Sequence, residues 1–241
     1  MADNSPRNEA VAALWEVVPD HVAYHAARES LTRLLEQHPD SSSLPLPACP
    51  DWTVRDTVAH LVDICRLAQG WLVDGPAPLP GPDAGPGFHD LLAEWAERGQ
   101  AAEALLVDTV QFTGPLILDV YSHELDIRRV LEVPPPDDHP AAPRAMKTAV
   151  GGFTGSVHAH GLPALRIEVP GASWVVGAGE PVVTVRGHRH DLYRSLTGRR
   201  SLEQIAALSW SASPAMWLPA FEWGPFQPPL KATEDAIDST N

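Results

Sequence analysis

The chain has 241 residues and carries 17 Lys and Arg against 31 Asp and Glu, which gives a formal net charge of −14. This acidic balance argues against nucleic acid or an anionic membrane as the main partner, because both attract clustered basic side chains. A hydrophobic content of 44% is sufficient for a packed core, and the length suits two small domains.

The N-terminal part of the chain predicts a bundle of helices. Five segments have apolar residues at helical spacing: residues 9–37, 53–73, 89–110, 115–131 and 141–160. Pro19 indicates a kink or a fresh start in the first of them. The second begins with Thr53-x-x-Asp56, which is typical of a capping box. A Pro/Gly-rich stretch at residues 74–87 predicts a surface loop.

The pattern changes after residue 161. Three short runs rich in β-forming residues follow, LRIEV, SWVVG and VVTVR, and then a helical stretch that Gly198 interrupts. We therefore predict an α+β protein with a helical bundle over residues 1–161 and a small α+β domain over residues 162–228. Residues 229–241 have little apolar content, which indicates a loose tail.

The bundle contains histidines and carboxylates at a suggestive spacing. His60 lies beside the main apolar stripe of its helix, on a second apolar strip. His123 is central on the core face of the 115–131 helix, and Asp119 precedes it by one turn. If these helices face each other, two imidazoles and one carboxylate converge on a divalent cation with an open position. Zn²⁺ suits this set, with Fe²⁺, Ni²⁺ or Mn²⁺ as alternatives. Asp56 and Asp126 are the candidate partners for the remaining ring nitrogens.

Spacing alone leaves another interpretation open. A histidine on an apolar face is often a hydrogen-bonded core residue, and Asp119 could simply pair with His123. Glu124 is the nearest alternative carboxylate, and we expect it to point off the core face. Cys65 lies on an apolar stripe and is expected to be a small buried hydrophobic residue.

Several other side chains receive structural interpretations. Three tryptophans are expected to pack the C-terminal domain: Trp210, Trp217 and Trp223. Three arginines are interpreted as solvated helix ends, with contact to a substrate carboxylate as the alternative: Arg194, Arg199 and Arg200. The first residues do not resemble a signal peptide, no apolar stretch is long enough to span a membrane, and Cys49 and Cys65 form no disulfide framework. We therefore expect a cytoplasmic protein with free thiols.

Three motifs in chain order resemble the mycothiol-dependent maleylpyruvate isomerase family, a branch of the DinB-like metal-binding bundles. CPDWTVRDTVAHL resembles the segment that leads to the family's first ligand histidine, here His60. DVYSHELDIRRVL resembles the second signature and implies Asp119 and His123 as the other ligands, although the family pattern has glutamate where this chain has Asp119. VVTVRGHRHDLYRSLTGRR resembles a motif of the family's C-terminal domain.

The resemblance spans about residues 10–210 and implies a DinB-like four-helix bundle with a small C-terminal domain. It also implies a metal-dependent enzyme, with Zn²⁺ as the metal and mycothiol as cosubstrate, in which a metal-activated thiolate is the nucleophile. The partner would be a small unsaturated acid in an isomerase-like reaction or a small electrophile in an S-transferase reaction. The alternatives are a non-catalytic metal-binding or sensor protein, and a structural bundle without metal. We expect no nucleic-acid or membrane partner and either a monomer or a dimer; the catalytic and substrate-binding residues remain unassigned.

Overall fold

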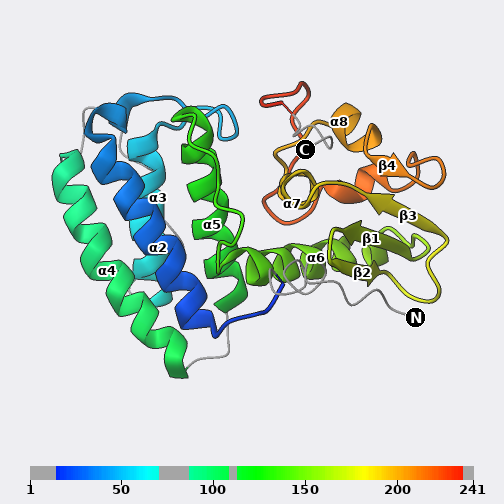
Figure 1. Cartoon of the computed structure of the whole chain (residues 1–241), viewed down its shortest axis with the longest axis horizontal. Helices are drawn as coiled ribbons and strands as arrows, with labels where there is room; N and C mark the ends of the chain where they lie inside the picture. Colours follow the sequence, from blue (N-terminus) through cyan, green and yellow to red (C-terminus); the bar gives the residue numbers. More distant parts are fainter. Residues whose placement is uncertain (1–14, 71–86, 109–112, 236–241) are drawn as a thin grey trace. The chain divides into compact units, whose positions relative to one another are not determined.

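The computed structural model describes residues 15–70, 87–108 and 113–235 (Figure 1). Helices come first along the chain and a small four-stranded sheet follows, so the predicted α+β class is confirmed. The chain divides into two compact units. Residues 17–145 form the first unit, and the described residues from Met146 onward form the second together with Trp15 and Glu16.

The first unit is a four-helix bundle. Its helices are α2 (Asp20–Gln37), α3 (Val54–Ala68), α4 (Phe88–Asp108) and α5 (Thr113–Val130). In Figure 1 they run side by side, and both α2 and α3 pack against α4 and α5. The short 3₁₀-helix η1 (Pro39–Ser43) lies in the loop between α2 and α3. Fully buried side chains such as Leu31, Leu61, Trp95 and Ile127 come from all four helices, and apolar burial therefore holds the bundle together.

The start of the first helix differs from the sequence expectation. Residues 15–19 are not helical, and Pro19 is instead the N-cap residue of α2. Proline disfavours helical geometry at the residue before it, so the helix begins afresh after Pro19. Residues 71–86 lie outside the described residues, and with them almost the whole predicted loop at 74–87.

The fifth predicted helix is α6 (Ala142–Ala159). The division between the two compact units falls in its first turn, between Ala145 and Met146. This helix was predicted to complete the N-terminal domain, whereas nearly all of it belongs to the second compact unit. The predicted domain boundary near Gly161 stays a prediction.

The second unit is built on a sheet of four strands. They are β1 (Leu165–Val169), β2 (Ala172–Val176), β3 (Val183–Arg186) and β4 (Ser209–Trp210), in the order β2-β1-β3-β4. β1 pairs antiparallel with β2 and parallel with β3, and β3 pairs antiparallel with β4. Two short helices, α7 (Arg189–Leu196) and α8 (Leu202–Ala206), and the 3₁₀-helix η2 (Leu218–Phe221) complete the unit. Gly198, with a φ of 70°, makes the break between α7 and α8.

The predicted tryptophan packing in this unit is confirmed. Trp210 stacks on Trp217 with ring centroids 6.5 Å apart, and it contacts Phe221 edge-on. Trp223 contacts Phe226, and its indole N–H donates to the carbonyl oxygen of Leu196. Among the described residues, no helix combines the length and apolar character needed to cross a membrane.

Candidate metal centre

The N-terminal end of α3 fixes the position of His60. The Thr53 hydroxyl accepts a hydrogen bond from the Asp56 backbone N–H, and the Asp56 carboxylate accepts one from the Thr53 backbone N–H at 2.9 Å. The predicted capping box is therefore confirmed. The same carboxylate oxygen accepts a bond from the Thr53 hydroxyl at 2.7 Å, so Asp56 is held at the first turn of α3. Its predicted role beside the imidazole of His60 stays a prediction.

Asp119 and His123 lie one turn apart on α5 and face His60 on α3. The Asp119 Oδ1 atom is 3.3 Å from His60 Nε2 and 3.6 Å from His123 Nε2. The rings of His60 and His123 meet edge-on with centroids 5.1 Å apart. The structure therefore brings the three predicted ligands together, with all three ligand atoms within 4.8 Å of one another.

The spacing of these atoms fits a zinc ion. Around a tetrahedral zinc with bonds of about 2.0–2.1 Å to nitrogen and oxygen, neighbouring ligand atoms are separated by roughly 3.4 Å. The two Asp119–histidine separations lie close to that value. The second carboxylate oxygen, Asp119 Oδ2, is buried without a hydrogen-bond partner. Buried polar atoms usually have a partner, so this oxygen is consistent with a site that binds a ligand.

The charges of Asp119, His60 and His123 depend on one another. Burial alone would raise the pKa of the Asp119 carboxyl, but hydrogen bonds and charge from His123 and His60 outweigh it and hold that pKa well below its usual value. Burial alone would lower the pKa of His123, but its interactions with Asp119, Asp126 and Cys49 raise it well above its usual value. Without a metal the cluster therefore favours an imidazolium held by carboxylates, and a cation must displace that proton.

Trp52 covers both imidazoles, a contact that the spacing of residues could not predict. Its ring lies 4.9 Å from that of His60 and 5.7 Å from that of His123, nearly parallel to the latter at 22°. The loop that carries Trp52 is pinned by backbone hydrogen bonds from Leu46 N–H to Trp52 O and from Trp52 N–H to Cys49 O. A pocket opens along this same loop, from Pro45 to Thr53.

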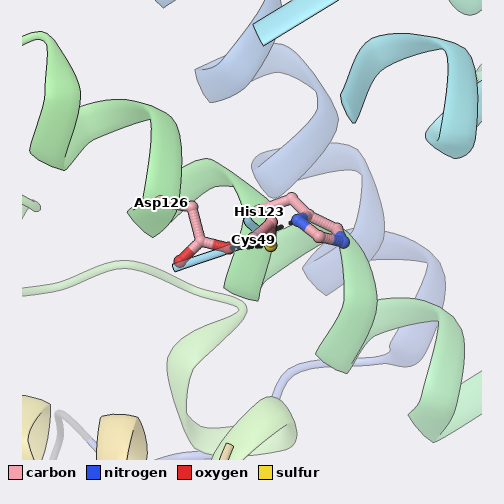
Figure 2. Close-up of side chains that lie close together, drawn as sticks. All are labelled: Cys49, His123 and Asp126. Carbon is pink, nitrogen blue, oxygen red and sulfur yellow. Dashed lines mark hydrogen bonds and ion pairs between the residues drawn. The ribbon is translucent and has the colours of Figure 1, made fainter. Parts of the chain in front are cut away.

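The Nδ1 edge of the His123 ring lies near two further side chains, shown in Figure 2. Asp126, one of the predicted partners, places its Oδ2 atom 3.3 Å from His123 Nδ1. The thiol of Cys49 donates to the same oxygen with a sulfur–oxygen distance of 3.7 Å. The sequence indicated a free thiol at Cys49 but gave no sign of this contact, because a loop residue has no fixed spacing relative to α5.

Glu124 is buried, and the expectation that it points off the core face is wrong. Its carboxylate accepts hydrogen bonds from Ser30 Oγ at 2.7 Å and Arg128 Nε at 2.7 Å, and it lies 2.9 Å from His139 Nε2. Almost every residue from Thr113 to Ile127 is buried, so the part of α5 around Glu124 has no side that faces solvent. Burial alone would raise the pKa of Glu124, but His139, Ser30 and Arg128 lower it.

The three arginines of the second unit are also buried, so their interpretation as solvated helix ends is wrong. Arg194 makes a two-pronged ion pair with Glu234, with distances of 2.7 and 2.9 Å. Arg200 pairs with both Asp191 and Glu234. Arg199 lies over the ring of Phe226, with its guanidinium carbon 5.6 Å from the ring centroid.

These pairs also revise the predicted tail. Glu234 lies in the segment expected to be loose, yet it is only 7% exposed and is held by two arginines. The side-chain amide of Gln204 donates a hydrogen bond to the backbone carbonyl oxygen of Glu234 at 2.8 Å. A loose tail is therefore wrong at Glu234, because ion pairs substitute for the missing apolar contacts. Residues 236–241 lie outside the described residues.

Comparison with known proteins bears on the N-terminal part of the chain. Searches among curated proteins and among solved structures found no match. A family model, the mycothiol maleylpyruvate isomerase N-terminal domain, matches residues 24–146, which is just over half of the chain. The matched range contains the three candidate ligands His60, Asp119 and His123. It also contains Cys49, Trp52 and Asp126. Because this family model covers more than half of the chain, the chain belongs to the mycothiol maleylpyruvate isomerase N-terminal domain family.

Proposed function

We propose that His60, Asp119 and His123, here called the first site, hold one divalent cation, Zn²⁺, in an enzyme that uses mycothiol as cosubstrate. The observation that carries the proposal is the convergence of two imidazole nitrogens on one carboxylate oxygen at zinc-like separations. Two histidines and one carboxylate are a ligand set of catalytic zinc sites, and they leave a fourth position open for a small ligand. The family supports mycothiol as that ligand.

The residues of the first site have distinct tasks in this proposal. A zinc ion there would lower the pKa of a bound thiol, which makes its thiolate available near neutral pH. Asp119 supplies the single negative charge among the ligands, and Trp52 restrains the two imidazole rings by lying against both. Asp126 lies beside His123 Nδ1, where a carboxylate orients a ligand histidine.

Two reactions suit such a thiolate. In an isomerase-like reaction, the mycothiol sulfur adds to a cis double bond conjugated to a carbonyl group. Rotation about the resulting single bond and loss of the same sulfur give the trans acid. In an S-transferase reaction, the sulfur forms a bond to an electrophilic carbon and stays there, while a leaving group departs from that carbon with its bonding electron pair. Both reactions need the same nucleophile, so the first site accommodates either one.

The second candidate is a non-catalytic metal-binding or sensor protein. The contacts of Asp119 with His60 and His123 would suit such a protein equally well, because these three side chains could bind a cation without a substrate. The two candidates differ in whether a thiol reaches the metal.

Metal content of the full-length protein tests the first site. We expect His60→Ala and Asp119→Asn each to lose one equivalent of zinc relative to the unsubstituted chain, as measured by elemental analysis after zinc loading and desalting. His158→Ala is the matched control, because His158 is exposed on α6 and should leave the zinc content unchanged. Equal zinc content in His60→Ala and the unsubstituted chain would sink the proposal.

Mycothiol binding then separates enzyme from sensor. We expect mycothiol to add a thiolate-to-cobalt absorption band to the cobalt-loaded Cys49→Ser protein, in which the nearest protein thiol has been removed. An unchanged cobalt spectrum would mean that the thiol does not reach the metal, and it would favour the non-catalytic candidate.

A further inference from the structure

The ring of His123 presents a nitrogen to each of two ligand clusters. Its Nε2 atom faces the first site, and its Nδ1 atom faces Asp126 and Cys49 (Figure 2). The Nδ1, Oδ2 and Sγ atoms all lie within 4.8 Å of one another. We call Cys49, Asp126 and His123 Nδ1 the second site.

The separations within the second site also fit a tetrahedral cation. With a zinc–sulfur bond of about 2.3 Å and zinc–nitrogen and zinc–oxygen bonds of about 2.0–2.1 Å, ligand atoms are separated by roughly 3.6 Å for a sulfur–oxygen pair and roughly 3.4 Å for a nitrogen–oxygen pair. The corresponding distances are 3.7 Å from Cys49 Sγ to Asp126 Oδ2 and 3.3 Å from His123 Nδ1 to Asp126 Oδ2. The first site has nitrogen–oxygen separations of 3.3 and 3.6 Å and no sulfur.

Burial indicates that this cluster does more than orient His123. His123 is 6% exposed and Asp126 is 2% exposed, so both sit in a poorly solvated place. The Nδ1 atom is buried and makes no hydrogen bond of good geometry, despite its closeness to the Asp126 carboxylate. A buried nitrogen without a hydrogen bond lowers the stability of the fold, and coordination to a cation would remove that cost. Cys49 is only partly buried, unlike His123 and Asp126.

The loop around Cys49 holds its sulfur in place. The Cys49 N–H donates to Leu46 O at 3.0 Å, and the Trp52 N–H donates to Cys49 O at 3.0 Å. Backbone bonds on both sides therefore fix the residue, so binding an ion at the sulfur requires little further ordering of the chain.

We propose that Cys49, Asp126 and His123 Nδ1 bind a second, thiophilic divalent cation such as Zn²⁺ or Cd²⁺, which the His123 ring joins to the cation of the first site. On binding, the Cys49 thiol and the Nδ1 atom each release a proton to solvent, and the ring becomes a bridging imidazolate. The Cys49 thiolate and the Asp126 carboxylate balance the two positive charges of the second cation. A sulfur ligand favours zinc and cadmium over magnesium and calcium.

Cobalt titration of the metal-free full-length protein tests the second site. We expect two equivalents of Co²⁺ to bind, with a thiolate-to-cobalt charge-transfer band growing during the titration. Cys49→Ser should bind one equivalent and lack the band, and His60→Ala should keep the band while losing the other equivalent. The band in His60→Ala therefore reports on the second site even if the first site fails.

Cys65→Ser is the matched control, because it removes the only other cysteine in the chain. Burial raises the pKa of the Cys65 thiol to about 11, and its sulfur lies 3.2 Å from the Tyr24 hydroxyl, so Cys65 should not bind cobalt. The band should persist in Cys65→Ser. Absence of the band from the unsubstituted chain, its survival in Cys49→Ser, or a single equivalent that carries the band would each overturn the two-cation arrangement.

Discussion

His123 is the residue on which the proposed chemistry of the first unit depends. Its two nitrogens face different carboxylates, Asp119 at 3.6 Å and Asp126 at 3.3 Å, and its ring stacks on Trp52. A ring with both nitrogens engaged and one face covered has a fixed orientation. The single imidazole thus links the proposed catalytic cation to the proposed second cation.

Glu124, the next residue along α5, should contribute stability that depends on pH. Its pKa is lowered in the folded protein from a usual value of 4.5, so the unfolded chain takes up the proton first as the pH falls. The contribution is complete above about pH 4.5 and is lost as the pH falls through the lower folded pKa. Glu124→Gln should reduce the free energy of unfolding at pH 7 by about 3 kcal/mol, because it leaves Arg128 and His139 without their anion.

Urea unfolding between pH 7 and pH 3 measures this effect. The loss of stability on acidification should be shallower in Glu124→Gln than in the unsubstituted chain. Glu36→Gln is the control, since Glu36 is exposed on α2 and should change neither the stability at pH 7 nor its pH profile. Parallel pH profiles for Glu124→Gln and the unsubstituted chain would contradict the expected role of the carboxylate.

At the scale of elements, the sequence was most informative where a local rule applied. The capping box of α3 follows from two residues three apart, and the pairing of Asp119 with His123 follows from one helical turn. The burial of Glu124 could not be predicted from spacing. Most side chains of α5 are buried, so the helix has no separate polar face on which a charged residue would be expected. The Cys49 contact was also invisible, because it joins a loop to α5 through tertiary packing alone.

The cap of α3 gives a prediction for the element that carries His60. Thr53→Ala removes the hydroxyl that accepts from the Asp56 N–H and donates to its carboxylate, so it should lower the free energy of unfolding by about 1 kcal/mol. Thr53→Ser keeps the hydroxyl and should stay within a few tenths of a kcal/mol of the unsubstituted chain. Denaturant unfolding compares the three proteins, and equal losses for alanine and serine would show that the methyl group, rather than the cap, matters.

At the scale of the whole molecule, both units combine an apolar core with buried charged groups. The bundle buries apolar side chains from four helices together with the ion pairs of Glu124, and the second unit adds a buried cluster of arginines and carboxylates to its aromatic core. Composition does not reveal such buried charge, since a charged residue near the chain end suggests solvent exposure by default. Only the fold shows that Arg194 and Arg200 meet Glu234 across 40 and 34 positions of sequence.

The last segment should therefore be needed for the stability of the second unit. Glu234→Gln leaves Arg194 and Arg200 buried with one carboxylate, Asp191, in place of two, which should cost about 3 kcal/mol of that unit's stability. Hydrogen exchange should show faster amide exchange in α7, while zinc content stays unchanged because every proposed ligand lies within residues 17–145. Glu203→Gln makes the same chemical change at an exposed position on α8 and should leave the exchange of α7 as it is. Unaltered protection of α7 in Glu234→Gln would mean that Asp191 alone satisfies both arginines.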